Sequence, residues 1–420
     1  MTIDSASSAG RPEQPAVSTD IRCPMKVLTR AFMHDPYPML TALRDTGPAA
    51  VAEVNGLRMW LVTRYHDVRR VLADPTFSKD IVQHRKRVMR QCVLHPERIA
   101  KMPLASRRSL LDRDGADHKR LRALLSGQFS PARVAQYRPR IEQIADELLD
   151  RLPVGEPVDL VNQFARPLVT TFISEVFGVP EGERDGFPVW ENDMLTAPSK
   201  AGIEEATRKL HELALRLIEI KRREPGDDVF TLLLRKHDED GVLDHDELAS
   251  TYLVLLVGGS EPTSAIGNGL LHLLSNPGQL AAVRADPSRY AACVDEILRY
   301  ESPFRMLAPR LAERAVELDG VTIPAGELVM ASVAAANRDP VRFADPERFD
   351  VTRDARGHLG FGHGPHRCLG SELGRLETTI ALRALVERFP GSRLAVPPDQ
   401  VRWRPGMFMR RLDSLPAVLG

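Results

Sequence analysis

The sequence has 420 residues, 43% of them hydrophobic, and its 57 Lys and Arg residues balance its 57 Asp and Glu residues. This length permits a large buried core, and a net charge of zero excludes proteins that bind nucleic acid through a strongly basic composition. The four cysteines are scattered without a CxxC pair, which argues against a disulfide framework or a zinc site and favours a reducing compartment.

The N-terminal segment is polar and rich in Ser and Pro, with no apolar run of signal-peptide length. We therefore expect a disordered leader over residues 1–20 and a single domain over residues 21–420. Since no stretch approaches about 18 uninterrupted apolar residues, the sequence predicts a soluble, cytoplasmic protein without a membrane segment. We also expect a monomer that binds no nucleic acid.

The first part of the chain alternates short helices with one hairpin, and then contains a long stretch without clear periodicity. Long loops in compact domains are usually functional or disordered. The predicted segments are a helix over 35–48, strands over 50–54 and 57–62 around Asn55-Gly56, a helix over 65–73 and a loop over 78–114 with at most one helical piece.

The rest of the chain is mostly helical, and its one strongly alternating stretch surrounds the turn Asp319-Gly320. These patterns predict a mainly α protein with small, segregated β-sheets. The predicted helices are 117–177 with breaks at Pro131 and 153–157, 202–224, 246–275 with a break at Gly258-Gly259 and Pro262, 289–300 and 371–389.

The segment FGHGPHRCLGSELGRLE, residues 361–377, surrounds Cys368 with glycines and leads into the last helix. A buried metal thiolate needs backbone N–H groups directed at sulfur, and glycines allow that close approach. The positive end of the following helix would also favour a thiolate. An inert buried cysteine is the alternative, and we adopt it for Cys23, Cys92 and Cys293.

This segment resembles the haem-binding signature of the cytochrome P-450 superfamily. The matching positions are Phe361, Gly362, Gly364, His366, Cys368 and Gly370. The resemblance implies the cytochrome P-450 fold, with haem (heme b) whose iron is ligated by Cys368. It further implies a monooxygenase that inserts one oxygen atom from O2 into a small organic substrate, by hydroxylation or epoxidation.

Other parts of the family pattern follow from the same resemblance. Glu296 and Arg299 match its Glu-x-x-Arg helix, with Arg348 as the third member of a buried structural network. The negatively charged haem propionates need cations beside them. Without the resemblance, each of the four residues that match propionate ligands would be read as a surface charge. The positions that match propionate ligands are His118, Arg122, Arg310 and His366.

The helix over 246–275 resembles the family's distal helix, where the pattern ends in an acidic residue and a threonine. Here Glu261 is followed by Pro262 at the threonine position, and Thr263 comes next. Proline removes an N–H and opens the helix, so the Gly258 carbonyl is freed. We expect protons to arrive through a water on Gly258 backed by Glu261, or through a substrate hydroxyl. The alternative is that Ser260 or Thr263 carries them.

The N-terminal part resembles bacterial members that tailor polyketides, macrolides and related antibiotics in secondary metabolism. Such enzymes imply electrons from ferredoxin and ferredoxin reductase, with Lys119 and Arg120 as candidate docking residues. The basic loop HRKRVMR, residues 84–90, suggests an anionic or carrier-protein-bound substrate, or only a solvated loop. Two other functions stay open: a peroxygenase that uses hydrogen peroxide, and a non-catalytic helper of a biosynthetic enzyme.

Overall fold

The computed structural model describes residues 32, 34–54, 57–81, 83–89, 91, 108–196, 199–406 and 408–420. The expected leader and the Asn55-Gly56 turn lie outside these ranges. Within them, no helix combines the length and apolar character needed to cross a membrane.

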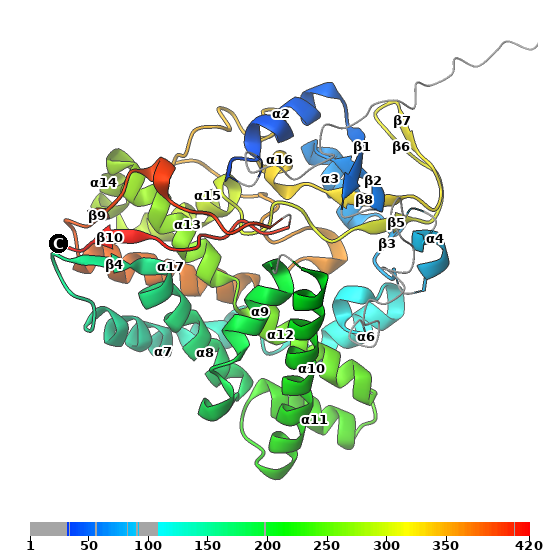
Figure 1. Ribbon diagram of the computed structural model, residues 1–420, viewed down its shortest axis with the longest axis horizontal. Coiled ribbons are helices and arrows are strands. Elements are labelled where there is room, and N and C mark those ends of the chain that lie inside the picture. Colours follow the sequence, from blue (N-terminus) through cyan, green and yellow to red (C-terminus); the bar gives the residue numbers. More distant parts are fainter. Residues whose placement is uncertain are drawn as a thin grey trace, which may run out of the picture.

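Helices make up most of the described chain, as predicted (Figure 1). Their bounds are α2 Tyr37–Thr46, α3 Tyr65–Ala73, α4 Arg85–Met89, α6 Gly115–Ser126, α7 Pro131–Leu149, α8 Arg166–Phe177, α9 Phe187–Thr196, α10 Lys200–Arg223, α11 Val229–Asp238, α12 His245–Gly259, α13 Pro262–Ser275, α14 Pro277–Ala285, α15 Tyr290–Tyr300, α16 Val333–Asn337 and α17 Ser371–Arg388.

The strands form small sheets apart from the helical layer, which confirms the predicted segregation (Figure 1). A five-stranded sheet has the order β1-β2-β8-β5-β3, a three-stranded sheet the order β4-β10-β9, and β6 pairs with β7. The bounds are β1 Ala49–Val54, β2 Leu57–Val62, β3 Phe77–Ser78, β4 Pro157–Asp159, β5 Arg310–Ala312, β6 Val316–Leu318, β7 Val321–Ile323, β8 Leu328–Ala331, β9 Arg393–Leu394 and β10 Pro416–Val418.

The hydrophobic core is largest where α13 passes between α15 and α17. Ten of the 14 residues of α13 are buried, on more than one face of the helix, which explains its largely apolar sequence. A Cβ at Gly269 would lie 2.8 Å from Ile297 Cδ1 and 3.2 Å from Leu382 Cδ1, so a larger residue there would require these two side chains to move. The long helix expected over 246–275 is therefore anchored along its second half.

That long helix is divided at the predicted place. α12 ends at Gly259 and α13 begins at Pro262, with Ser260 and Glu261 between them. Proline suits the first turn of a helix because it lacks the N–H that would find no partner there, whereas in a helix interior it would break the hydrogen-bond ladder. The proline thus starts a second helix.

Candidate active site

The Cys368 loop is held by its own backbone and by α3. The Cys368 N–H donates to the Phe361 carbonyl at 2.8 Å, and the Gly370 N–H donates to the Cys368 sulfur. Gly364 has a φ of 73°, and a Cβ there would lie 2.7 Å from the Cα of Ala73. Only glycine combines this left-handed conformation with this close approach, so the loop is seated against α3.

Cys368 retains accessible surface although protein encloses it on all sides. Burial raises the pKa of its thiol, and Glu261 raises it further, while the Gly370 N–H, Arg367 and Arg122 act in the opposite direction. The guanidinium groups of Arg367 and Arg122 therefore act on the sulfur. A thiolate in this position has a hydrogen-bond donor and cations to stabilise it.

The four predicted cationic residues converge beside this loop. The His118 and His366 rings lie with their centroids 4.2 Å apart, and Arg310 is buried close by, donating to the Phe77 carbonyl at 3.3 Å. Burial, together with the charges of His366, Arg122 and Arg310, lowers the pKa of His118 to about 4. These mutually repelling groups, gathered from α6, β5 and the Cys368 loop, form a cationic cluster suited to anions.

Two nitrogen atoms of this cationic cluster indicate that it binds a polar group. His118 Nε2 and His366 Nδ1 are buried, and neither has a hydrogen-bond partner among the described residues. Buried polar atoms are nearly always paired, so both point to a polar group from outside the protein. On α12, a Cβ placed on Gly258 would have no atom of the described residues within 4 Å. Haem, which the resemblance to cytochrome P-450 implies, would fit this arrangement, with the histidines and arginines binding its propionates and Cys368 its iron.

The helix break and the Cys368 loop meet at Gly374 of α17. A Cβ there would lie 3.7 Å from Phe361 Cε1 and 3.8 Å from Pro262 Cγ. The predicted distal residues are thus within one side-chain layer of the signature segment.

Glu261 lies in this break as a buried carboxylate. Its Oε1 accepts from Arg411 Nη2, while its Oε2 has no partner among the described residues. Burial raises the pKa of Glu261 to about 7, with a further contribution from Glu191, although Arg411 lowers it. A small polar cavity adjoins the break, and Ser260, Thr263, Ser264, Arg166, Glu191 and Arg411 are among its lining residues.

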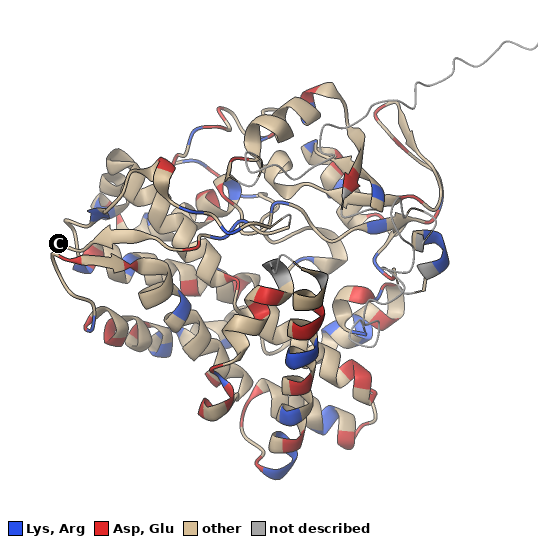
Figure 2. Ribbon diagram, in the orientation of Figure 1, with Lys and Arg blue, Asp and Glu red and all other residues tan. Residues whose placement is uncertain are grey.

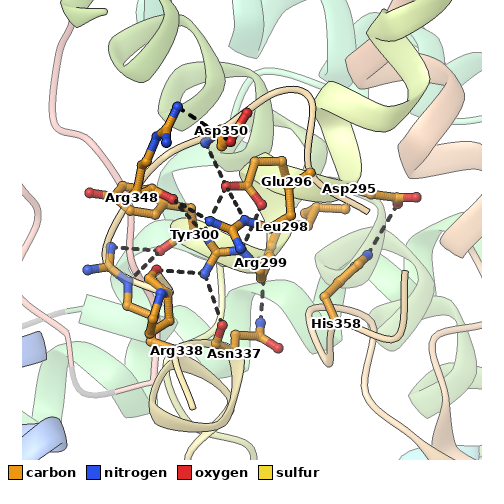
Figure 3. A network of polar contacts seen from close by, with 12 residues as sticks. Asp295, Glu296, Leu298, Arg299, Tyr300, Asn337, Arg338, Arg348, Asp350 and His358 are labelled. Atoms are coloured by element: carbon orange, nitrogen blue, oxygen red, sulfur yellow. Dashed lines mark hydrogen bonds and ion pairs between the residues drawn. The ribbon is translucent and has the colours of Figure 1, made fainter. Parts of the chain in front are cut away.

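The Glu-x-x-Arg pair is buried, as expected, but its third member was assigned wrongly. Arg299 Nε donates to Glu296 Oε2 at 2.7 Å, and neither side chain is exposed. The Arg348 side chain instead points toward Asp350 and is 65% exposed; only its carbonyl accepts from Arg299 (Figure 3). Arg353, 12% exposed, approaches Glu296 Oε1 at 3.4 Å and therefore takes the place predicted for Arg348.

The two predicted docking residues on α6 lie in different environments. Lys119 is exposed, but Arg120 Nη2 donates to Glu247 Oε1 on α12 at 2.6 Å and its Nη1 donates to the Val242 carbonyl at 2.5 Å. Arg120 therefore holds α6 against α12 and is not a free surface cation. A helix start rich in Lys and Arg does not reveal which cation faces a neighbouring helix.

In the basic loop, Lys86 and Arg87 are exposed on α4, which is the basic helix at the right of Figure 2. His84 instead lies 3.1 Å from Glu313 Oε1. Arg90 lies outside the described residues.

Sequence reasoning missed several residues of this site, which are Asp114, Glu191, Glu377 and Arg411. Glu377 on α17 is buried with its Oε1 unpartnered among the described residues, and burial raises its pKa well above the usual range. A carboxylate in the apolar stripe of the last helix was the available signal for this residue. The others carry no local signal, because their partners are distant in sequence.

Comparisons with known proteins identify the family. Residues 187–411 match the family model described as Cytochrome P450. The chain is 41% identical to 6-deoxyerythronolide B hydroxylase of Saccharopolyspora erythraea over 396 residues, 93% of this chain and 97% of that protein.

Two solved structures are also similar. The tirandamycin C-bound P450 monooxygenase TamI has a TM-score of 0.87 and 39% identity, covering 94% of this chain and 99% of that one. P450BioI in complex with an acyl carrier protein that carries hexadec-9Z-enoic acid has a TM-score of 0.81 and 32% identity, covering 93% and 100%. The chain therefore belongs to the cytochrome P450 family and is a monooxygenase, an oxidoreductase.

Proposed function

We propose that this monooxygenase binds haem b through Cys368 and oxidises a small intermediate of secondary metabolism, by hydroxylation or epoxidation. The observation that carries the cofactor assignment is the pair of buried, unpartnered nitrogens on His118 and His366 beside an accessible Cys368. Arg122 and Arg310 supply the remaining cations for the propionates. Once bound, haem supplies the oxygen-activating chemistry, and the chain positions and shields it.

The cofactor assignment is tested by Cys368→Ser. The wild-type enzyme, reduced and exposed to carbon monoxide, should show the long-wavelength Soret band of thiolate-ligated haem. Cys368→Ser should abolish that band while circular dichroism keeps its helical signal. Cys293→Ser is the matched control, since Cys293 is buried in the helical core. An unchanged spectrum in Cys368→Ser would refute the assignment, and a wild-type protein that binds no haem would favour the non-catalytic helper.

The substrate class is proposed from the relatives and from charge. The relatives named above act on or bind 6-deoxyerythronolide B, tirandamycin C and an acyl carrier protein that carries hexadec-9Z-enoic acid, as their names state. Lys86 and Arg87 on α4 are exposed cations, which suit an acidic substrate or an acidic carrier protein. Binding of free and carrier-linked intermediates is measurable by the Soret shift. Neutralising these two residues should weaken only the acidic or carrier-linked ligands, and an equal loss for neutral ligands would refute the charge argument.

We further propose that electrons come singly from a ferredoxin and its reductase, and that the helix break supplies protons. Glu261, Gly258 and the hydroxyl of Thr263 surround Pro262 at this break. Ser260 Oγ donates to the Val257 carbonyl at 2.9 Å, so its proton is already engaged. Thr263 lines the polar cavity together with Arg411. A water on the Gly258 carbonyl, backed by Glu261, or a hydroxyl of the substrate is the proposed route.

A further inference from the structure

The Asp114 carboxylate connects three segments of the chain beside the cationic cluster of His118, Arg122, Arg310 and His366. Its Oδ2 accepts from Ser78 Oγ at 2.8 Å and from the backbone N–H groups of Lys79 at 2.6 Å and Asp80 at 3.2 Å. Its Oδ1 lies 3.1 Å from His366 Nε2. Asp114 directly precedes α6, whose His118 N–H donates to the Asp114 carbonyl at 3.2 Å. The side chain thus links residues 78–80 and the Cys368 loop at the start of α6.

This contact determines how the His366 ring is placed. Although burial raises the pKa of Asp114, the hydrogen bonds from His366, Ser78 and the backbone outweigh it and hold that pKa well below its usual range. An ionised carboxylate only accepts hydrogen bonds, so His366 Nε2 donates to Asp114, and Nδ1 must carry a proton as well when it donates to a propionate. The opposite nitrogen, Nδ1, is then directed away from Asp114, and it is the buried atom without a partner.

Arg113 next to Asp114 does not compete for this carboxylate. Its Nη1 pairs with Asp80 Oδ2 at 3.1 Å. One carboxylate oxygen of Asp114 therefore accepts hydrogen bonds from residues 78–80, and the other contacts His366.

We propose that Asp114 is a positioning residue for the haem propionates, acting through His366, whose ring it turns so that Nδ1 faces the cofactor. The proposal rests on the haem site proposed above. It extends to a propionate-binding histidine the arrangement found at metal-binding histidines, where a carboxylate orients the ring and loss of that carboxylate weakens metal binding roughly 10- to 100-fold.

The test is haem release from the purified holoenzyme to an excess of apomyoglobin. Asp114→Asn retains the backbone carbonyl that binds His118, and its amide oxygen can still accept from Ser78, Lys79 and Asp80. Its NH2 group then faces His366 Nε2 and cannot accept a hydrogen bond from the Nε2–H group. We expect release to accelerate roughly 10- to 100-fold. The control Ser78→Ala removes one donor to Asp114 without touching His366 and should release haem at nearly the wild-type rate.

A double-variant cycle separates positioning from general damage. If Asp114 acts through His366, then Asp114→Asn should not accelerate release further in a His366→Ala background. The resonance Raman band of propionate bending should also shift in Asp114→Asn and stay unchanged in Ser78→Ala. Multiplicative effects in the cycle, or a wild-type release rate in Asp114→Asn, would overturn the proposal. Failure of the haem site itself is recognised separately, by a wild-type enzyme without the thiolate-ligated spectrum.

Discussion

Arg411 Nη2 lies between two carboxylates, Glu191 of α9 and Glu261 at the helix break. It donates to Glu191 Oε1 at 2.6 Å and also to Glu261 Oε1, and all three side chains are largely buried. One guanidinium therefore serves two carboxylates that repel each other. This arrangement connects α9 to the break that we propose for proton delivery.

Arg411→Gln should destabilise the protein more as the pH rises. In the folded protein the pKa of Glu261 is already raised to about 7, so folding becomes less favourable as the pH rises from the ordinary carboxyl value through that range. Without the cation this pKa rises further, and removing one partner of a buried ion pair costs about 3–5 kcal/mol. Urea unfolding at mildly acidic and mildly alkaline pH measures the difference.

Glu191→Gln is the matched opposite change, because it removes a charge that raises the pKa of Glu261. This variant should lose less stability with rising pH than the wild type. Equal pH profiles for Glu191→Gln and Arg411→Gln would contradict the shared-arginine interpretation.

Arg353 and Arg348 offer a comparison of two nearby arginines. Arg353 contacts Glu296 and donates to the carbonyls of Ala344, Asp345 and Arg348, so Arg353→Ala should lower the free energy of unfolding by about 1.5–3 kcal/mol. Arg348→Ala should change it by less than about 0.5 kcal/mol, because that side chain is mostly exposed. Urea unfolding followed by circular dichroism distinguishes them, and a larger loss in Arg348→Ala would restore the original assignment.

The same pair shows where sequence reasoning ends. Cys368, Glu296 and Arg299 were found because their partners lie within a few residues, and a contiguous pattern records them. The choice between Arg348 and Arg353 depends on how the loop turns, and Asp345 within it adopts a φ of 45° that no periodicity signals. Arg411 and Glu191 are 220 residues apart, so only the folded chain brings them together.

Secondary structure was likewise predicted where the local pattern is strong and missed where it is weak. The helix over 65–73 was predicted to the residue, because its apolar positions repeat at helical spacing. The three-stranded sheet β4-β10-β9 was not predicted, since strands of two or three residues are too short to show alternation. α14 was also missed, and of its residues only Val283 is buried, which leaves little apolar pattern.

Lys119→Glu should slow reduction by an acidic ferredoxin and weaken the salt dependence of that rate. The reason is that exposed charges steer such encounters and are screened by salt. Stopped-flow reduction at several ionic strengths measures both effects. Lys236→Glu on α11 is the control and should leave both unchanged. Arg120→Glu should instead destabilise the fold, because it places a carboxylate against Glu247. An unchanged rate in Lys119→Glu would show that this face is not the dock.

Coupling, meaning product formed per NADH consumed, tests the role of Pro262. Because this residue has no hydroxyl, the proposed route uses a water on Gly258 backed by Glu261, or a hydroxyl of the substrate. If the substrate assists, an analogue without its nearest hydroxyl should lower coupling in the wild type. Pro262→Thr should then partly restore coupling with that analogue, since it returns a hydroxyl to the break.

The remaining outcomes of the coupling experiment would identify a different source of the protons. If the analogue couples as well as the native substrate, substrate assistance is wrong, and loss of coupling in Thr263→Ala or Ser260→Ala would identify the hydroxyl responsible. We expect the larger loss in Thr263→Ala, because the Ser260 hydroxyl already donates to the Val257 carbonyl while Thr263 lines the polar cavity beside Arg411. Turnover with hydrogen peroxide alone, as fast as with ferredoxin and oxygen, would make the protein a peroxygenase and remove the need for a proton route through Glu261.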